Sequence, residues 1–149
     1  MTVDARSVYR QATGQSASPV HLVVLLYEQM VDDLHRALAA LANGSAEVLS
    51  LEVGHALEVL GQLQGRLDMA RGGEVSRNLE SFYNLTRTSL IQAQVQSSAD
   101  ILRKQVASLL TLREAWMEVE RIEGAGDVTS PATANTAAAT AEKKLSWSV

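Results

Sequence analysis

The sequence predicts an all-α fold, an antiparallel up-down four-helix bundle with a short N-terminal helix and a flexible C-terminal tail. The first observation is that no proline lies between Pro19 and Pro131, and an internal proline costs a helix about 3 kcal/mol. The second is that this stretch consists mainly of Ala, Leu, Glu, Gln and Arg, which are good helix formers. The third is that short Gly, Asn and Ser segments divide it into pieces of similar length. Four matched helices joined by short turns pack most simply as an up-down bundle.

The expected helix boundaries follow from capping and breaking residues. Ser18 followed by Pro19 gives an N-cap and a proline at the first helical position, where the missing N–H is harmless. The later breaks are Asn43-Gly44-Ser45, Gly72-Gly73, Ser97-Ser98 before Asp100, and Gly124 to Gly126. We therefore expect helices at about 4–13, 19–43, 46–71, 74–96 and 98–122.

Within each long helix, residues recur at steps of three and four, the spacing of one helical face. The predicted core residues are Val23, Tyr27, Met30, Leu34, Leu38 and Leu41, then Leu49, Val53, Ala56, Leu60, Leu63 and Leu67, then Val75, Leu79, Phe82, Thr86, Leu90 and Ala93, and finally Leu102, Val106, Leu109, Arg113 and Trp116. The chain is therefore expected to divide into an N-terminal cap segment, 1–17, a bundle domain, 18–123, and a tail, 124–149.

The expected tail differs from the bundle in composition. Residues 127–141 contain almost no side chain large enough to bury, so burial cannot offset the entropy cost of ordering them. We therefore expect a flexible segment. Near its end, Trp147 fits two interpretations, a docking anchor or an aromatic side chain packed loosely on its own bundle.

Composition restricts the class of protein. The chain has 149 residues, 46% of them hydrophobic and 20% charged, as expected for one globular domain. Its formal net charge of -4 disfavours nucleic-acid binding, which needs clustered basic residues. The chain has no cysteine, so disulfides and thiolate sites are excluded. With no apolar run of membrane-spanning or signal-peptide length, we expect a cytoplasmic protein without membrane insertion.

Catalytic and metal-binding motifs are weak. Glu52-Val-Gly-His55 matches one element of a carboxylate-bridged di-iron bundle, but His55 lies about 120° from the centre of its predicted core stripe. His35 is displaced similarly. His21, His35 and His55 all lack the Lys-Gly pair that follows the reactive histidine of a phosphotransfer domain. We therefore expect no metal, no cofactor and no enzymatic activity.

Apolar residues also lie outside the predicted core stripes. Val48, Leu51 and Val59 form a second row on the helix expected at 46–71, and Leu85 lies off the stripe of the next helix. At the start of the helix at 19–43, Leu22, Leu25 and Leu26 make the first turns apolar nearly all round. Such a row is typical of a groove for a partner helix. A wider core and a homodimer face are the alternatives.

An ordered set of residues runs through the expected bundle. Its members are Tyr9, Ser16-Ala17-Ser18-Pro19, Leu22, Leu25-Leu26-Tyr27-Glu28, Leu63, Leu67-Asp68, Gly72-Gly73-Glu74-Val75, Asn78-Leu79, Tyr83, Leu90, Ala93, Val106, Leu109-Leu110, Arg113 and Ala115-Trp116. This set resembles the flagellar export chaperones for flagellin, the FliS family. From Tyr9 to Trp116 the resemblance covers about 108 of the 149 residues.

The resemblance implies a cytoplasmic chaperone that binds the disordered C-terminal segment of flagellin one-to-one, prevents premature polymerisation and delivers it to the flagellar type III export apparatus. It implies a mobile N-terminal cap around Tyr9 that also touches the export machinery. Further partners to consider are the export gate, an anti-sigma factor or other flagellar regulator, and a second copy of the free protein. The expected contact residues are Tyr9, Leu22, Leu25, Leu26, Tyr27, Val48, Leu51, Val59 and Leu85. The alternative is a helical signalling module for phosphotransfer or scaffolding.

Overall fold

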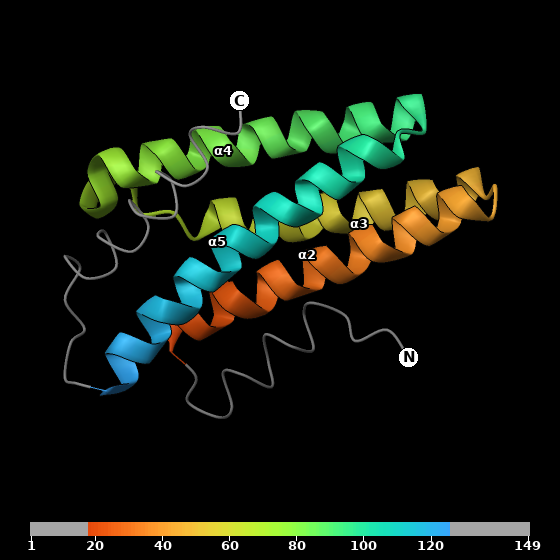
Figure 1. Cartoon of the computed structure of the whole chain (residues 1–149). Helices are drawn as coiled ribbons and strands as arrows, with labels where there is room; N and C mark the ends of the chain where they lie inside the picture. The colour runs from red at the N-terminus through yellow and green to blue at the C-terminus, as the bar shows by residue number, and fades with distance from the viewer. Residues whose placement is uncertain (1–17, 126–149) are drawn as a thin grey trace.

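The computed structural model describes residues 18–125, without the side chains of 69–71 and 123–125. The described residues form four helices, α2 (Pro19–Ala42), α3 (Ala46–Gly65), α4 (Met69–Gln96) and α5 (Ala99–Ala125). Successive helices run in opposite directions (Figure 1). The predicted all-α up-down bundle is therefore confirmed. The expected helix at 4–13 and the expected tail from Gly126 lie outside the described residues.

Serine side chains cap the starts of three helices. The Ser18 hydroxyl accepts a hydrogen bond from the His21 backbone N–H, and Ser45 accepts one from Val48. Ser98 does the same for Ile101 at the start of α5. Each serine satisfies an N–H group that has no partner within the helix. The capping residues identified in the sequence therefore set these three boundaries.

The connection between α3 and α4 differs from the prediction. The helix expected at 46–71 ends at Gly65, and a new helical turn begins at Met69. Gly73 then interrupts α4 with φ 54° and ψ -126°, a conformation that a side chain disfavours. At Gly72 a Cβ would lie 1.7 Å from the Ser76 hydroxyl oxygen, so a glycine is needed there too. Gly72 and Gly73 change the direction of the chain, whereas α3 has already ended at Gly65.

The helices pack as the corners of a square. α2 contacts α3 and α5, and α4 contacts the same two helices less extensively. Hence α2 and α4 lie on one diagonal (Figure 1). The core lies between the four helices, and every residue of the four predicted core stripes is buried or partly buried. The periodicity therefore identified the inward face of each helix correctly.

Two tyrosines join the diagonal helices through the middle of this core. Tyr27 of α2 and Tyr83 of α4 are buried, and their hydroxyl groups are hydrogen-bonded to each other. Burial raises the pKa of both phenols well above the ordinary value. The Trp116 indole N–H lies near enough to lower the pKa of Tyr27 slightly, but it forms no hydrogen bond of ordinary geometry. Each hydroxyl thus depends on the other for its partner.

Replacing Tyr27 with Phe leaves the Tyr83 hydroxyl buried without a partner. We expect the free energy of unfolding to fall by about 1–3 kcal/mol, the cost of an unsatisfied buried polar group. The double variant Y27F/Y83F removes both hydroxyls and should lose less than the sum of the two single variants. Urea denaturation of the four proteins measures this coupling. Strictly additive losses would show that the two hydroxyls do not depend on each other.

Candidate functional site

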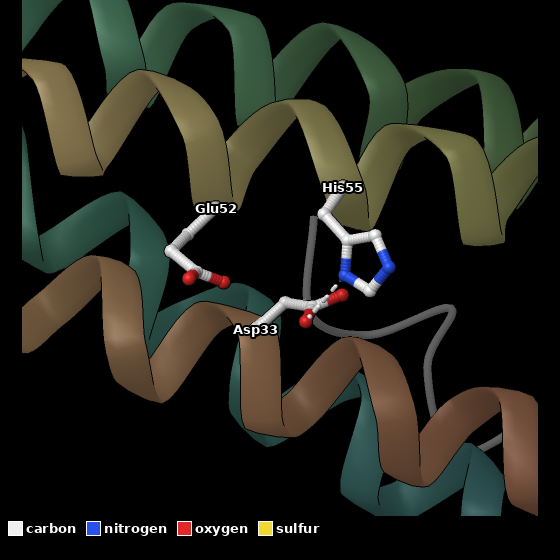
Figure 2. Close-up of side chains that lie close together, drawn as sticks. All are labelled: Asp33, Glu52 and His55. Atoms are coloured by element: carbon white, nitrogen blue, oxygen red, sulfur yellow. Dashed lines mark hydrogen bonds and ion pairs between the residues drawn. The ribbon is translucent and has the colours of Figure 1, made fainter. Parts of the chain in front are cut away.

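A cluster of charged side chains lies between α2 and α3. Its centre is Asp33, whose side chain is fully buried. One carboxylate oxygen, Oδ1, accepts hydrogen bonds from Gln29 Nε2 at 3.0 Å, Arg36 Nη2 at 2.6 Å and His55 Nδ1 at 2.8 Å. The bond to His55 crosses from α2 to α3 (Figure 2). Because three donors bind the same oxygen, the Asp33 carboxylate is held in one position at the α2–α3 interface.

Arg36 connects the cluster to a second carboxylate. Its Nε donates to Glu52 Oε2 at 3.1 Å, while its Nη2 donates to Asp33. Burial raises the pKa of Asp33, and the hydrogen bond from His55 is the largest influence in the opposite direction. The second oxygen of Asp33, Oδ2, is buried and has no hydrogen-bond partner. The carboxylate therefore remains costly to ionise despite its three donors.

The same cluster has the composition of a metal site. Donor atoms of Asp33, Glu52 and His55 lie within 4.8 Å of one another, and Figure 2 shows the three side chains meeting between α2 and α3. The guanidinium of Arg36, however, is bound to both carboxylates and already supplies the positive charge that they require. We therefore assign the cluster to the stability of the α2–α3 interface.

The placement of His55 corrects one sequence-based expectation. His55 lies about 120° from the predicted core stripe and was expected to point away from the interior, yet it contacts the fully buried Asp33. The reason is that α3 has two neighbours: His55 faces α2, whereas Ser50 is hydrogen-bonded to Gln94 of α4. A helix that packs against two neighbours buries a wider arc of its surface than one stripe of core residues covers.

The same reason explains why several expected contact residues are buried. Val59 lies one turn after His55 on the α2 side of α3 and is fully buried, so the expected exposed row is wrong at this position. Leu22 and Leu26 lie on the α3 side of α2 and are buried, as is Tyr27. Leu26, Tyr27 and Val59 belong to the hydrophobic core, and Leu22 is buried as well.

The remaining expected contact residues differ in exposure. Val48, Leu51 and Leu85 are exposed, and Leu25 is half-buried. Tyr9 lies outside the described residues. Exposed apolar side chains that were not among the expected contacts also occur on α4 and α5. These are Ile91, Val95, Leu110 and Met117.

Three of the exposed apolar residues lie on the outer surfaces of α3 and α4. These two helices are neighbours, joined by the hydrogen bond from Gln94 Nε2 to Ser50 Oγ, 3.0 Å long. Leu51 belongs to α3, and Ile91 and Val95 belong to α4. Leu51 and Val95 are 69% and 80% exposed, and Ile91 is 47% exposed. We call Leu51, Ile91 and Val95 the α3–α4 apolar patch.

The patch is open to a partner. Gly54 lies one turn after Leu51, and a Cβ at this position would meet no atom within 4 Å. Exposed Glu47 and Glu58 lie on the same side of α3 as Leu51, so an apolar centre has acidic neighbours, as at many protein interfaces. Sequence periodicity marked Leu51 as lying off its core stripe, and the fold makes its helix a neighbour of α4, which carries Ile91 and Val95.

Replacing Arg36 with Met tests the charge cluster. Arg36 is partly exposed, so we expect a loss of about 2 kcal/mol in the free energy of unfolding at pH 7, between the values for exposed and buried ion pairs. Without Arg36 the raised pKa of Asp33 rises further, and the folded state then takes up a proton more readily than the unfolded state. The loss should therefore shrink as the pH falls towards 4. Urea denaturation at both pH values measures it. An equal loss at both would contradict the assignment.

In the described part of the chain, no helix is both long and apolar enough to cross a membrane.

Comparison with known proteins identifies the family. The family model described as flagellar protein FliS matches residues 1–123. The flagellar secretion chaperone FliSB of Pseudomonas aeruginosa is 27% identical over 106 residues, 71% of this chain and 84% of the relative. The flagellar secretion chaperone FliS of Campylobacter jejuni is 29% identical over 119 residues, 80% of this chain and 93% of the relative. The flagellar secretion chaperone FliS of Salmonella typhimurium is 28% identical over 110 residues, 73% of this chain and 82% of the relative. The chain therefore belongs to the FliS family of flagellar secretion chaperones, and it is a chaperone, not an enzyme.

Proposed function

We propose that this chaperone binds the C-terminal segment of flagellin one-to-one in the cytoplasm and delivers it to the flagellar type III export apparatus. While bound, the segment cannot polymerise. The support comes from the family, whose relatives are named flagellar secretion chaperones, and from the α3–α4 apolar patch. The patch is the observation that carries the proposal, because its three apolar side chains are exposed on a bundle that has its own buried core.

The chemistry of the client fits such a surface. A segment that becomes helical in the filament is amphipathic, and as a free monomer it exposes an apolar face that needs cover. Such a face packs into an apolar groove through side chains spaced three and four residues apart. Covering about 600 Å² of apolar surface at about 25 cal/mol per Å² gives roughly 15 kcal/mol before the costs of ordering and association. The remaining affinity allows release at the export gate.

The client is expected to extend beyond the patch. Val48 lies on α3 one turn before Leu51 and is 42% exposed, and Leu85 on α4 is 65% exposed. We include both as contacts, together with Leu25 on α2, which is half-buried. Tyr9, in the N-terminal segment, is proposed to cover part of this surface when no client is bound.

The double variant L51D/V95D tests the patch by isothermal titration with a peptide of the C-terminal ~40 residues of flagellin from the same organism. Wild-type chaperone should bind it with 1:1 stoichiometry and a negative heat-capacity change. The variant should bind about tenfold more weakly or worse, a loss of at least about 1.4 kcal/mol, because each aspartate places a charge in an apolar contact. Both side chains are exposed, so helicity and melting temperature should be unchanged.

Met117→Asp on α5 is the matched control. Met117 is also an exposed apolar residue, but it lies outside the patch, so this variant should bind as the wild type does. Unchanged affinity in L51D/V95D would refute the patch as the client surface. Absence of binding by the wild type would refute flagellin as the client.

A further inference from the structure

An apolar cavity lies at the end of the bundle where α2 begins and α5 ends. Its volume is about 120 Å³. All four helices contribute to its wall. Val23, Leu63, Val75, Leu79 and Trp116 belong to the apolar part of the lining, and Arg66, Asp68 and Ser76 form the polar part. An engineered cavity of about 150 Å³ lined by Leu, Ile and Phe binds benzene. This cavity is therefore of the size that accepts one aromatic ring.

The sequence beyond α5 carries a side chain of that kind. After Gly126 the only large apolar side chains are Val128, Leu145, Trp147 and Val149. Leu145, Trp147 and Val149 alternate along the chain, so an extended segment presents all three on one side. The FliS family model ends at residue 123, so the family's shared function does not account for this cluster.

The segment is long enough to reach the cavity. Trp116 lies nine residues before the end of α5 at Ala125, which is about 14 Å along a helix. An unstructured chain of the roughly 21 residues from Gly126 to Trp147 has a root-mean-square span of about 25 Å. Such a tether gives an effective concentration in the millimolar range. A contact whose dissociation constant lies below this concentration would therefore be formed most of the time.

We propose that the Trp147 side chain docks into this cavity within the same molecule. The six-membered ring fills the space between Leu63, Val75 and Trp116, and the indole N–H faces the polar rim formed by Asp68 and Ser76. A buried tryptophan commonly places its N–H at such an edge. The chain thus covers the apolar end of its own bundle with a segment from outside the family domain, leaving the α3–α4 apolar patch free.

The two tryptophans of the chain allow a direct test. With 5-fluorotryptophan incorporated, the full-length chain gives two ¹⁹F signals, and the variant W147F assigns them while Trp116 stays in the cavity wall. We expect the Trp147 signal to shift severalfold less between H₂O and D₂O than it does in a free peptide of residues 126–149. A second variant, V75F, fills the cavity and should return this shift to that of the peptide. The matched control L85F, an aliphatic-to-Phe change on the exposed side of the same helix, should leave Trp147 protected.

Three outcomes would overturn the proposal. A peptide-like Trp147 signal in the otherwise unchanged chain would show that Trp147 stays in water. Protection that persists in V75F, with helicity retained, would place Trp147 elsewhere. Protection that is lost on dilution would show that the cavity takes the tail of a second copy. The L85F control, the free peptide and far-UV circular dichroism separate these outcomes from misfolding. No client is present in the experiment, so its result is independent of the function proposed above.

Discussion

The burial of α2 among the other three helices is the constraint on which the rest of the structure depends. α2 packs along α3 and α5, and Tyr27 extends its contacts across the core to Tyr83 of α4. Its polar groups make this burial specific, because the fully buried Asp33 takes two of its three hydrogen bonds from Arg36 and His55. On the opposite side, Glu28 is paired with Arg113 of α5 at 2.7 Å. A different register of α3 against α2 would leave the Asp33 carboxylate without its donor from α3.

This arrangement decides where apolar surface remains available. α4 contacts its neighbours less extensively than α2 does, and its apolar residues outside the core, Leu85, Ile91 and Val95, are exposed. Leu22 and Leu26 of α2, by contrast, are buried. Exposed large apolar side chains thus remain on the outer sides of α3 and α4, whereas α2 carries none among the described residues. This division fits the proposed function, because a client could bind the outer face without disturbing the core.

Local rules predicted the helices well, because the signals are local. The serine caps at Ser18 and Ser45 and the three- and four-residue periodicity depend on neighbours in sequence. The burial of Val59 and the position of His55 could not be predicted in this way, because they depend on which two helices flank α3. The end of α3 at Gly65 was missed for a related reason. An isolated glycine such as Gly65 is tolerated inside a helix, and the turn after it is completed by the Ser76 hydroxyl, which donates to the Asp68 carbonyl at 2.9 Å. Of the candidate site, Leu51 was predicted, whereas Ile91 and Val95 were not among the expected contacts.

A client that lies over the outer face of α3 and α4 can be detected by site-specific photocrosslinking. A photoreactive phenylalanine analogue is placed at Val95 and, in a second protein, at Met117 of α5. Both wild-type side chains are exposed and apolar, so the two probes differ in location alone. We expect the probe at 95 to capture the C-terminal segment of flagellin and the probe at 117 not to capture it. Capture from position 117 without capture from position 95 would contradict this expectation.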